Sequence, residues 1–350
     1  MSSLSALYRV CFKRSIGWMT LLIGGVISTG LIAETEVNNA VAGTQFLEGM
    51  SNAFKTTQYD GIFIYAQGDD VQTLRVIHKV KDGVEKERLI HLDGIRFELI
   101  RDENGVVCVL PNDLDGKVEH GIPPVSFAQS FLNNITELRK NYHVTEMHQR
   151  RLLGREIVHV SISPKTGDRY GYQLWFDRTS GLLLKSLLHD GNKNTLERFQ
   201  FSSLEIGKPI PDYLFMIENP DQVRVVHVPK ELSETGEIEN SGWQVGWLPS
   251  GFYSIMNDSI PMASALMEKL EYMQTYSDGL FSFSVFVEKT ADSNLEEMYS
   301  RKGATTVISR KISDLENYYG ITLVGEIPLP VARRIVSSTR KNNLSNETAQ

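Results

Sequence analysis

Eight histidines are the side chains of this sequence best suited to metal binding or to acid–base catalysis. No two of them stand in an H-E-x-x-H motif, and none lies in a Cys/His cluster. The closest pair, His143 and His148, is five residues apart in a strand-like context, which does not aim both rings at one ion. The sequence therefore predicts no metal site and no cofactor. The histidines are His78, His91, His120, His143, His148, His159, His189 and His227.

Other catalytic motifs are also missing from the sequence. It contains no G-x-S-x-G elbow, no P-loop and no dinucleotide-binding glycine motif between a strand and a helix. Glu85 and Glu87 alternate with Lys86 and Arg88, a pattern that predicts a solvated strand face with cross-strand ion pairs. We expect a non-enzymatic protein, although an exported hydrolase with an unrecognised site stays open, because catalytic triads are assembled in space.

The two cysteines, Cys11 and Cys108, cannot both serve the mature protein if the N-terminal segment is removed. Cys108 lies in the apolar run Gly-Val-Val-Cys-Val-Leu, so we expect a buried, inert thiol.

The charge of the chain is unevenly distributed. The net charge is -7, which gives no reason to expect nucleic-acid binding, yet residues 301–342 carry eight Lys or Arg against three acidic residues. This basic region could contact an acidic partner or lipid phosphates, and an ordinary solvated face is the alternative. The candidate contact residues are Arg301, Lys302, Arg310, Lys311, Arg333 and Arg334.

The first 33 residues have the pattern of an export signal. Arg9, Lys13 and Arg14 precede an apolar run from Ile16 to Ala33, and polar residues follow. The run is also long enough for an uncleaved membrane anchor, and the cleavage point stays open. Both interpretations place the body of the protein outside the cytoplasm.

Residues 43–217 are predicted to form one large antiparallel sheet. Amphipathic helices are expected at 44–57 and from Ser126 to Tyr142. About ten short strands, separated by Gly-, Asp- and Asn-containing turns, are expected before and after the second helix in the sequence. Residues 218–240 are polar or Pro-containing and predict a linker with a short strand at 223–228. Residues 241–342 predict a smaller α+β domain that ends in a helix at 328–340.

Several strands of the first domain carry apolar residues at both odd and even positions. A strand with one face in water instead alternates apolar and polar residues. Both faces of the sheet therefore need cover, by core packing, by barrel closure, by the second domain or by an apolar ligand. As candidate residues for an acyl-chain site we select Ile62, Ile64, Leu182, Leu184 and Leu188.

In their order along the chain, these segments resemble the RseB/MucB family of periplasmic regulators of the envelope-stress sigma-E factor. The resemblance lies in residues 59–65, 73–78, 87–94, 172–177, 179–186, 196–201, 243–252, 276–285 and 324–328. It implies an α+β fold: a LolA/LolB-like curled antiparallel half-barrel with helices on one face, followed by a smaller C-terminal α+β domain.

The resemblance also implies a function. Members bind the periplasmic domain of a membrane-spanning anti-sigma factor (RseA/MucA) and shield it from proteolysis, and lipid or lipopolysaccharide releases the shield. A periplasmic lipoprotein or lipid carrier is the alternative function, against which the second domain argues. The sequence is compatible with a homo-oligomer.

Overall fold

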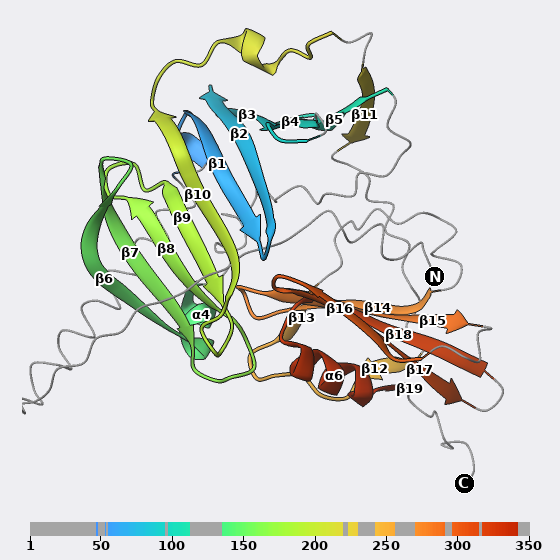
Figure 1. Cartoon of the computed structure of the whole chain (residues 1–350). Helices are drawn as coiled ribbons and strands as arrows, with labels where there is room; N and C mark the ends of the chain where they lie inside the picture. Colours follow the sequence, from blue (N-terminus) through green and yellow to red (C-terminus); the bar gives the residue numbers. More distant parts are fainter. Residues whose placement is uncertain are drawn as a thin grey trace, which may run out of the picture. The chain divides into compact units, whose positions relative to one another are not determined.

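The computed structural model describes two units of the chain. The described residues are 47, 53, 55–94, 97–112, 135–219, 223–229, 242–255, 270–290, 296–314 and 317–341. The tertiary contacts within the chain separate these two units between residues 232 and 233 (Figure 1). No helix among these residues is long and apolar enough to cross a membrane. The expected export signal lies outside the described residues.

The described residues of the first unit form an open antiparallel sheet of eleven strands, in place of the curled half-barrel expected from the resemblance. Its first meander contains β1 (Tyr59–Gln67), β2 (Asp70–Lys81), β3 (Val84–His91), β4 (Glu98–Asp102) and β5 (Gly105–Pro111). Helix α4 (Ile135–Asn141) precedes a second meander of β6 (Tyr142–Leu152), β7 (Arg155–Pro164), β8 (Gly171–Asp177), β9 (Leu183–His189) and β10 (Thr195–Ile206). Strand β11 (Val223–Pro229) then pairs with β5.

The two meanders meet along a single seam. The strand order is β11-β5-β4-β3-β2-β1-β10-β9-β8-β7-β6, so among the described strands β1 and β10 alone join the halves. Tyr59 pairs with Ile206 and Tyr65 with Phe199, with a bulge between Ile62 and Phe63. Gly61 lies at this seam, where an added Cβ would come within 2.6 Å of the Phe201 ring. The close approach of an aromatic ring explains why glycine occupies this position.

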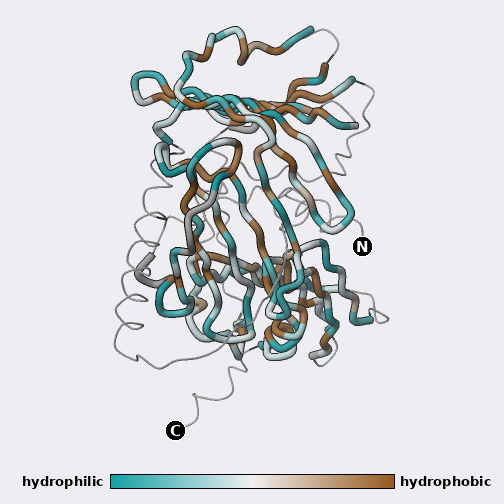
Figure 2. The backbone as a smooth tube through the Cα atoms, turned by 60° about the vertical axis from the view of Figure 1, so that its left-hand side comes forward, coloured by the Kyte–Doolittle hydropathy of each residue, from teal (hydrophilic) through white to brown (hydrophobic). Residues whose placement is uncertain are grey.

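Hydrophobic and hydrophilic residues alternate along strands of the first unit, and Figure 2 shows them as changes between brown and teal. The core is built from the residues on one side of this alternation. Phe63 and Tyr65 of β1 pack with Leu74, Leu89 and Phe201 on one face of the sheet. Phe63 lies 4.9 Å from Phe199 and 5.9 Å from Phe201, measured between ring centroids. These aromatic pairs stabilise the seam beyond their buried area.

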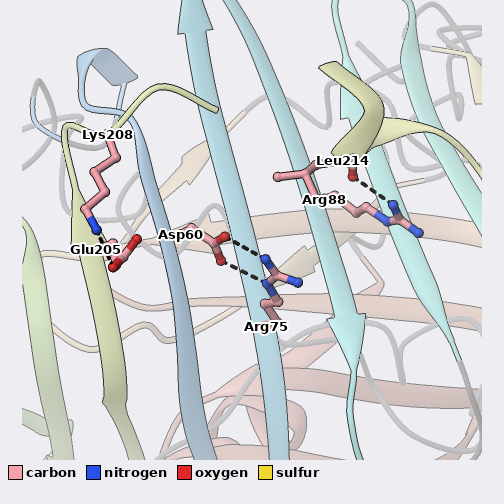
Figure 3. A network of polar contacts seen from close by, with 6 residues as sticks. All are labelled: Asp60, Arg75, Arg88, Glu205, Lys208 and Leu214. Atoms are coloured by element: carbon pink, nitrogen blue, oxygen red, sulfur yellow. Dashed lines mark hydrogen bonds and ion pairs between the residues drawn. The ribbon is translucent and has the colours of Figure 1, made fainter. Parts of the chain in front are cut away.

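A short strap connects β10 to β11. Its 3₁₀ helix η2 (Asp212–Phe215) is held by Arg88 of β3, whose Nη1 donates to the carbonyl oxygens of Leu214 at 2.7 Å and Met216 at 3.0 Å (Figure 3). Lys79 Nζ lies 2.9 Å from Asp212 Oδ1. The strap is thus fixed to the sheet through two backbone carbonyls and one ion pair.

The described residues of the second unit form a six-stranded antiparallel sheet in the order β13-β14-β15-β18-β17-β16. Its elements are β12 (Trp243–Val245), β13 (Tyr253–Ile255), β14 (Leu270–Ser277), β15 (Ser282–Thr290), β16 (Met298–Lys302), β17 (Thr305–Asp314), β18 (Asn317–Glu326), α6 (Leu329–Ser338) and β19 (Thr339–Lys341). Strands β12 and β19 form a separate pair.

Helix α6 contributes Ala332, Ile335 and Val336 to the core of this unit, which also contains Phe283 and Ile321. Pro328 precedes the first turn, where its fixed φ is compatible with the start of a helix. The expected helix at 328–340 is therefore present but ends at Ser338, and Thr339 to Lys341 form β19 because they pair with β12.

The first unit contains the short antiparallel strands expected from the sequence, ten of them described within residues 43–217. The sequence missed β12, β13 and β16, which are short strands without a clear alternating pattern. Strand β11 lies inside the expected linker at 218–240, yet it pairs with the first sheet. The expected helices at 44–57 and 126–142 fall largely outside the described residues. The second is seen as α4, and Tyr142 begins β6.

Candidate functional site

The exposed side of α6 gathers cationic side chains in the second unit. One stripe of the helix is buried in the core, so Arg333, Arg334 and Ser337 at the intervening positions are exposed. Strand β17 adds Arg310, whose Nη1 donates to Ser337 Oγ at 2.7 Å. We call Arg310, Arg333 and Arg334 the arginine face.

Aromatic side chains orient two of these guanidinium groups. Arg334 stacks on the Trp247 ring with its Cζ 3.7 Å from the ring centroid. Arg333 lies 4.9 Å from the centroid of Tyr299 and donates from Nε to Glu297 Oε1 at 3.1 Å. A stacked guanidinium keeps its planar set of donors in a fixed orientation. The arginine face is therefore suited to bind carboxylates or phosphates in a bidentate manner.

The six cations selected from the sequence do not all share this face. Arg310 is paired with Ile321 in the sheet register, so it lies on the side that carries the core under α6. Arg301 of β16, paired with Thr306, lies on the same side and is exposed. The neighbouring Lys302 and Lys311 point to the opposite side, because successive side chains of a strand alternate.

The five residues selected for an acyl-chain site are also divided. Leu182 and Leu184 belong to the core cluster with Phe63, and Leu188 is fully buried. Ile62 and Ile64 point to the other face of β1 from Phe63, where Ile64 is 37 % exposed. The structure therefore brings Leu182 and Leu184 together but separates them from the two isoleucines.

A buried polar row that the sequence did not reveal crosses four strands of the first unit. Tyr59, His78, Glu87 and Arg101 are successive cross-strand partners on β1, β2, β3 and β4. The rings of Tyr59 and His78 stack at 5.0 Å, and His78 Nδ1 donates to the Thr57 carbonyl oxygen at 2.9 Å. Arg101 Nη2 lies 3.4 Å from Glu87 Oε1. We call these four residues the buried row.

Burial shifts the titration of this row. It raises the pKa of Glu87 to about 7, although the charge of Arg101 opposes the shift. Burial also lowers the pKa of His78, while the hydrogen bond to Thr57 opposes that change. The four residues are aligned by the pairing register of β1 to β4. The pattern of a single sequence does not give that register.

The expectation of a solvated face at residues 85–88 was wrong for two of them. Glu87 and Arg88 are each 3 % exposed. Arg88 Nε donates to Glu98 Oε2 at 2.9 Å, and Glu98 is also buried. The strap covers Arg88, which the local pattern cannot indicate because η2 lies more than 120 residues away.

Among the described residues, no three His, Cys, Asp or Glu side chains lie close enough to hold a metal ion. Cys108 of β5 is half-buried, and burial raises the pKa of its thiol. A raised thiol pKa disfavours the nucleophilic thiolate.

Two family models match the chain. The MucB/RseB N-terminal domain matches residues 42–219, and the MucB/RseB C-terminal domain matches residues 237–340.

Curated relatives span nearly the whole chain. It is 30 % identical over 313 residues to the sigma factor AlgU regulatory protein MucB of Pseudomonas aeruginosa, covering 89 % of this chain and 95 % of that protein. It is 26 % identical over 323 residues to the sigma-E factor regulatory protein RseB of Escherichia coli K12, covering 92 % and 96 %.

Solved structures give the same result. The crystal structure of MucB in complex with MucA(peri) matches with a TM-score of 0.68 and 28 % identity, covering 86 % of this chain and 99 % of that one. The crystal structure of MucB matches with a TM-score of 0.55 and 25 % identity, covering 86 % and 98 %.

Proposed function

Since both family models match in order along the chain, this protein belongs to the MucB/RseB family, and we propose on that premise that it binds the periplasmic domain of a membrane-spanning anti-sigma factor. The observation that carries the proposal is the similarity, over 86 % of this chain, to MucB solved in complex with MucA(peri). The relatives are regulatory proteins and the family is not an enzyme family.

In this proposal the protein acts in the periplasm as a negative regulator. Bound to the anti-sigma factor, it shields that protein from the protease that makes the first cut, and lipid or lipopolysaccharide reverses the shielding. Ligand and partner need only favour different states of the protein for one to weaken binding of the other. A coupling of about 1–3 kcal/mol corresponds to roughly 5–150-fold in affinity.

The proposed division of labour follows the boundaries expected from the sequence. Residues 43–217, which contain ten strands of the open sheet, receive the lipid in this proposal. Residues 241–342 present the arginine face to acidic groups of the partner or to lipid phosphates. Support for the second role comes from Arg333 and Arg334, which are exposed while aromatic rings fix their orientation.

Calorimetry of the full chain with the periplasmic domain of the anti-sigma factor from the same organism tests this proposal. We expect Arg333→Glu/Arg334→Glu to weaken binding at least about tenfold, because each reversal removes a charge-assisted contact and adds repulsion. Lys79→Glu/Lys208→Glu, which changes charge equally in the first unit, is the matched control. Wild-type affinity in the Arg333/Arg334 variant would remove the arginine face from the proposal.

Two further measurements separate the proposed function from the carrier alternative. Adding the full chain should slow the first proteolytic cut of the anti-sigma factor, and adding lipopolysaccharide should restore it. Pull-down from a periplasmic extract should recover one anti-sigma factor. Recovery of many lipoproteins without it would instead identify a carrier.

A further inference from the structure

One face of the second meander carries two rows of side chains without a carboxylate. The sheet register pairs His159 with Trp175, Trp175 with Lys185, and Lys185 with Gln200. The adjacent row pairs Ser161 with Gln173, Gln173 with Leu187, and Leu187 with Arg198. Directly paired residues share a face, so these eight side chains lie together on β7 to β10. We call them the basic rows.

Aromatic stacking orients the cation at the centre of the basic rows. Lys185 Nζ lies 4.9 Å from the centroid of the Trp175 ring, within the range of a cation–π contact. The imidazole of His159 stacks on Trp175 with centroids 4.2 Å apart and planes 10° apart. The indole therefore stands between a neighbouring ring and the lysine, which restricts where the ammonium group can lie.

The two cations of the basic rows have no acidic partner among the described residues. Lys185 and Arg198 form no ion pair there, and Arg198 is exposed. Burial lowers the pKa of Lys185, and the positive charge of Arg198 lowers it further. Unpaired like charges on adjacent strands destabilise a sheet, and a bound anion would remove that cost. This contrasts with Arg75 and Lys208, which each contact a carboxylate (Figure 3).

Neutral polar groups surround the cations. Gln173 Nε2 donates to Ser161 Oγ at 2.9 Å, and Gln173 Oε1 lies 2.5 Å from His159 Nε2. An amide, an imidazole and a hydroxyl held in this way can complete the hydrogen bonding of a phosphate without adding negative charge.

An apolar margin continues the same face. Gln200 is paired with Ile64, and Arg198 with Ala66, which is paired in turn with Val71. Ile64 is 37 % exposed and Val71 is 57 % exposed. Cations next to exposed aliphatic side chains match an amphiphile, whose phosphate and acyl chain are covalently joined.

We propose that the basic rows, centred on Lys185 and Arg198, bind the phosphate group of an anionic lipid whose acyl chain lies along Ile64 and Val71. The inference deepens the proposed function, because it names the ligand group and the residues through which lipid would act. It also places the phosphate on the first unit and leaves the arginine face free for the partner.

Titration calorimetry of the full chain, without the anti-sigma factor, tests the proposal. The probes are a short-chain phosphatidic acid below its critical micelle concentration, phosphatidylcholine of equal chain length, and inorganic phosphate. We expect phosphatidic acid to bind more tightly than phosphatidylcholine. Lys185→Gln/Arg198→Gln should weaken that binding by about tenfold to a hundredfold, because two charge-assisted contacts are lost.

The control is Lys79→Gln/Lys208→Gln, which removes two cations that already contact carboxylates and should bind as wild type. Inorganic phosphate binding as tightly as phosphatidic acid would keep the anion site and assign it to free phosphate. Unchanged phosphatidic acid binding in the Lys185/Arg198 variant, or no binding by the wild type, would refute the proposal. Partner affinity is measured separately without lipid, so failure of this site leaves the proposed function to be judged by its own test.

Discussion

The buried row of the first unit and the arginine face of the second use similar charged groups in opposite ways. Glu87 of the buried row is 3 % exposed, and nearby Arg88 and Glu98 are equally inaccessible. On the arginine face, the side chain of Arg333 is 47 % exposed and its partner Glu297 is 41 % exposed. Both regions contain ion pairs, but Glu87, Arg88 and Glu98 are withdrawn from solvent, whereas Arg333 and Glu297 are open to it.

This difference separates structural charges from charges available for recognition. A charge taken out of water must keep its partner, so the pairs near the buried row hold strands and strap in one arrangement. An exposed pair contributes little stability and exchanges partners easily. Substitutions of the buried Glu87, Arg88 and Glu98 should therefore change stability, and those on the arginine face should change binding.

The largest expected effect follows from Arg88→Met. The variant leaves Glu98 buried without its partner and releases the carbonyls of Leu214 and Met216, which should cost about 3–5 kcal/mol of unfolding free energy. Chemical denaturation followed by circular dichroism measures the loss. Arg88→Met/Glu98→Leu should recover much of it by removing the unpaired charge. A single variant within about 1 kcal/mol of wild type would show that the pair does not hold this region.

The pH dependence of Glu87→Gln should be the next largest effect. The pKa of Glu87 is about 7 in the fold, against 4.5 as the reference value, so the folded state binds the proton more tightly. Between those values the wild type loses stability as pH rises, by about 1.4 kcal/mol per pH unit and up to about 3 kcal/mol in total. The glutamine variant lacks this loss. Its stability relative to wild type should therefore increase from pH 4.5 to 7.

Denaturation at several pH values gives the difference between the two proteins. His78 titrates in the opposite sense, because burial lowers its pKa, and its contribution is present in both proteins. Arg101→Gln should raise the pKa of Glu87 further by removing the neighbouring positive charge. A difference that stays constant with pH would show that Glu87 ionises normally.

A smaller effect is expected for Trp247→Leu. Removing the ring on which Arg334 stacks should cost about 0.5–1 kcal/mol of stability from the lost cation–π contact. The freed guanidinium should also bind the partner more weakly, because its orientation is no longer fixed. Denaturation and partner calorimetry measure the two effects. Arg334→Lys, which keeps the charge, should reproduce the loss of affinity if orientation rather than charge is responsible.

The smallest effect should come from Arg333→Gln. Its pair with Glu297 is solvated on both sides, so the unfolding free energy should change by less than about 0.5 kcal/mol. The same denaturation assay measures it. A loss comparable to that of Arg88→Met would abolish the distinction between the two regions.

The strands were predictable because their signals are local. Strand β1 (Tyr59–Gln67) is rich in aromatic and β-branched side chains and is followed by Gly68, a turn residue. The environment of Glu87 was not predictable, because it depends on the register of four strands. Nor was that of Arg88, because the strap returns from a distant part of the sequence.

The candidate sites show the same limit. The cations at 301–334 were found as a cluster in sequence, but alternation along β16 and β17 sends Lys302 and Lys311 to the other face. Lys185 and Arg198 were not found, because the absence of acidic neighbours becomes visible only when strands β7 to β10 are aligned.

The single seam between β1 and β10 has a kinetic consequence. Each meander is built from neighbouring strands and can form early, but Tyr59 must find Ile206 across nearly 150 residues before the sheet is continuous. A chain that emerges from its N-terminus completes β1 long before β10 exists. Until then the hydrogen-bonding edge of β1 and the rings of Phe63 and Tyr65 are uncovered, which is the condition under which strands pair with the wrong neighbour. Closure of the seam should therefore be the slow step of folding, and a chaperone should have its largest effect in the interval before it.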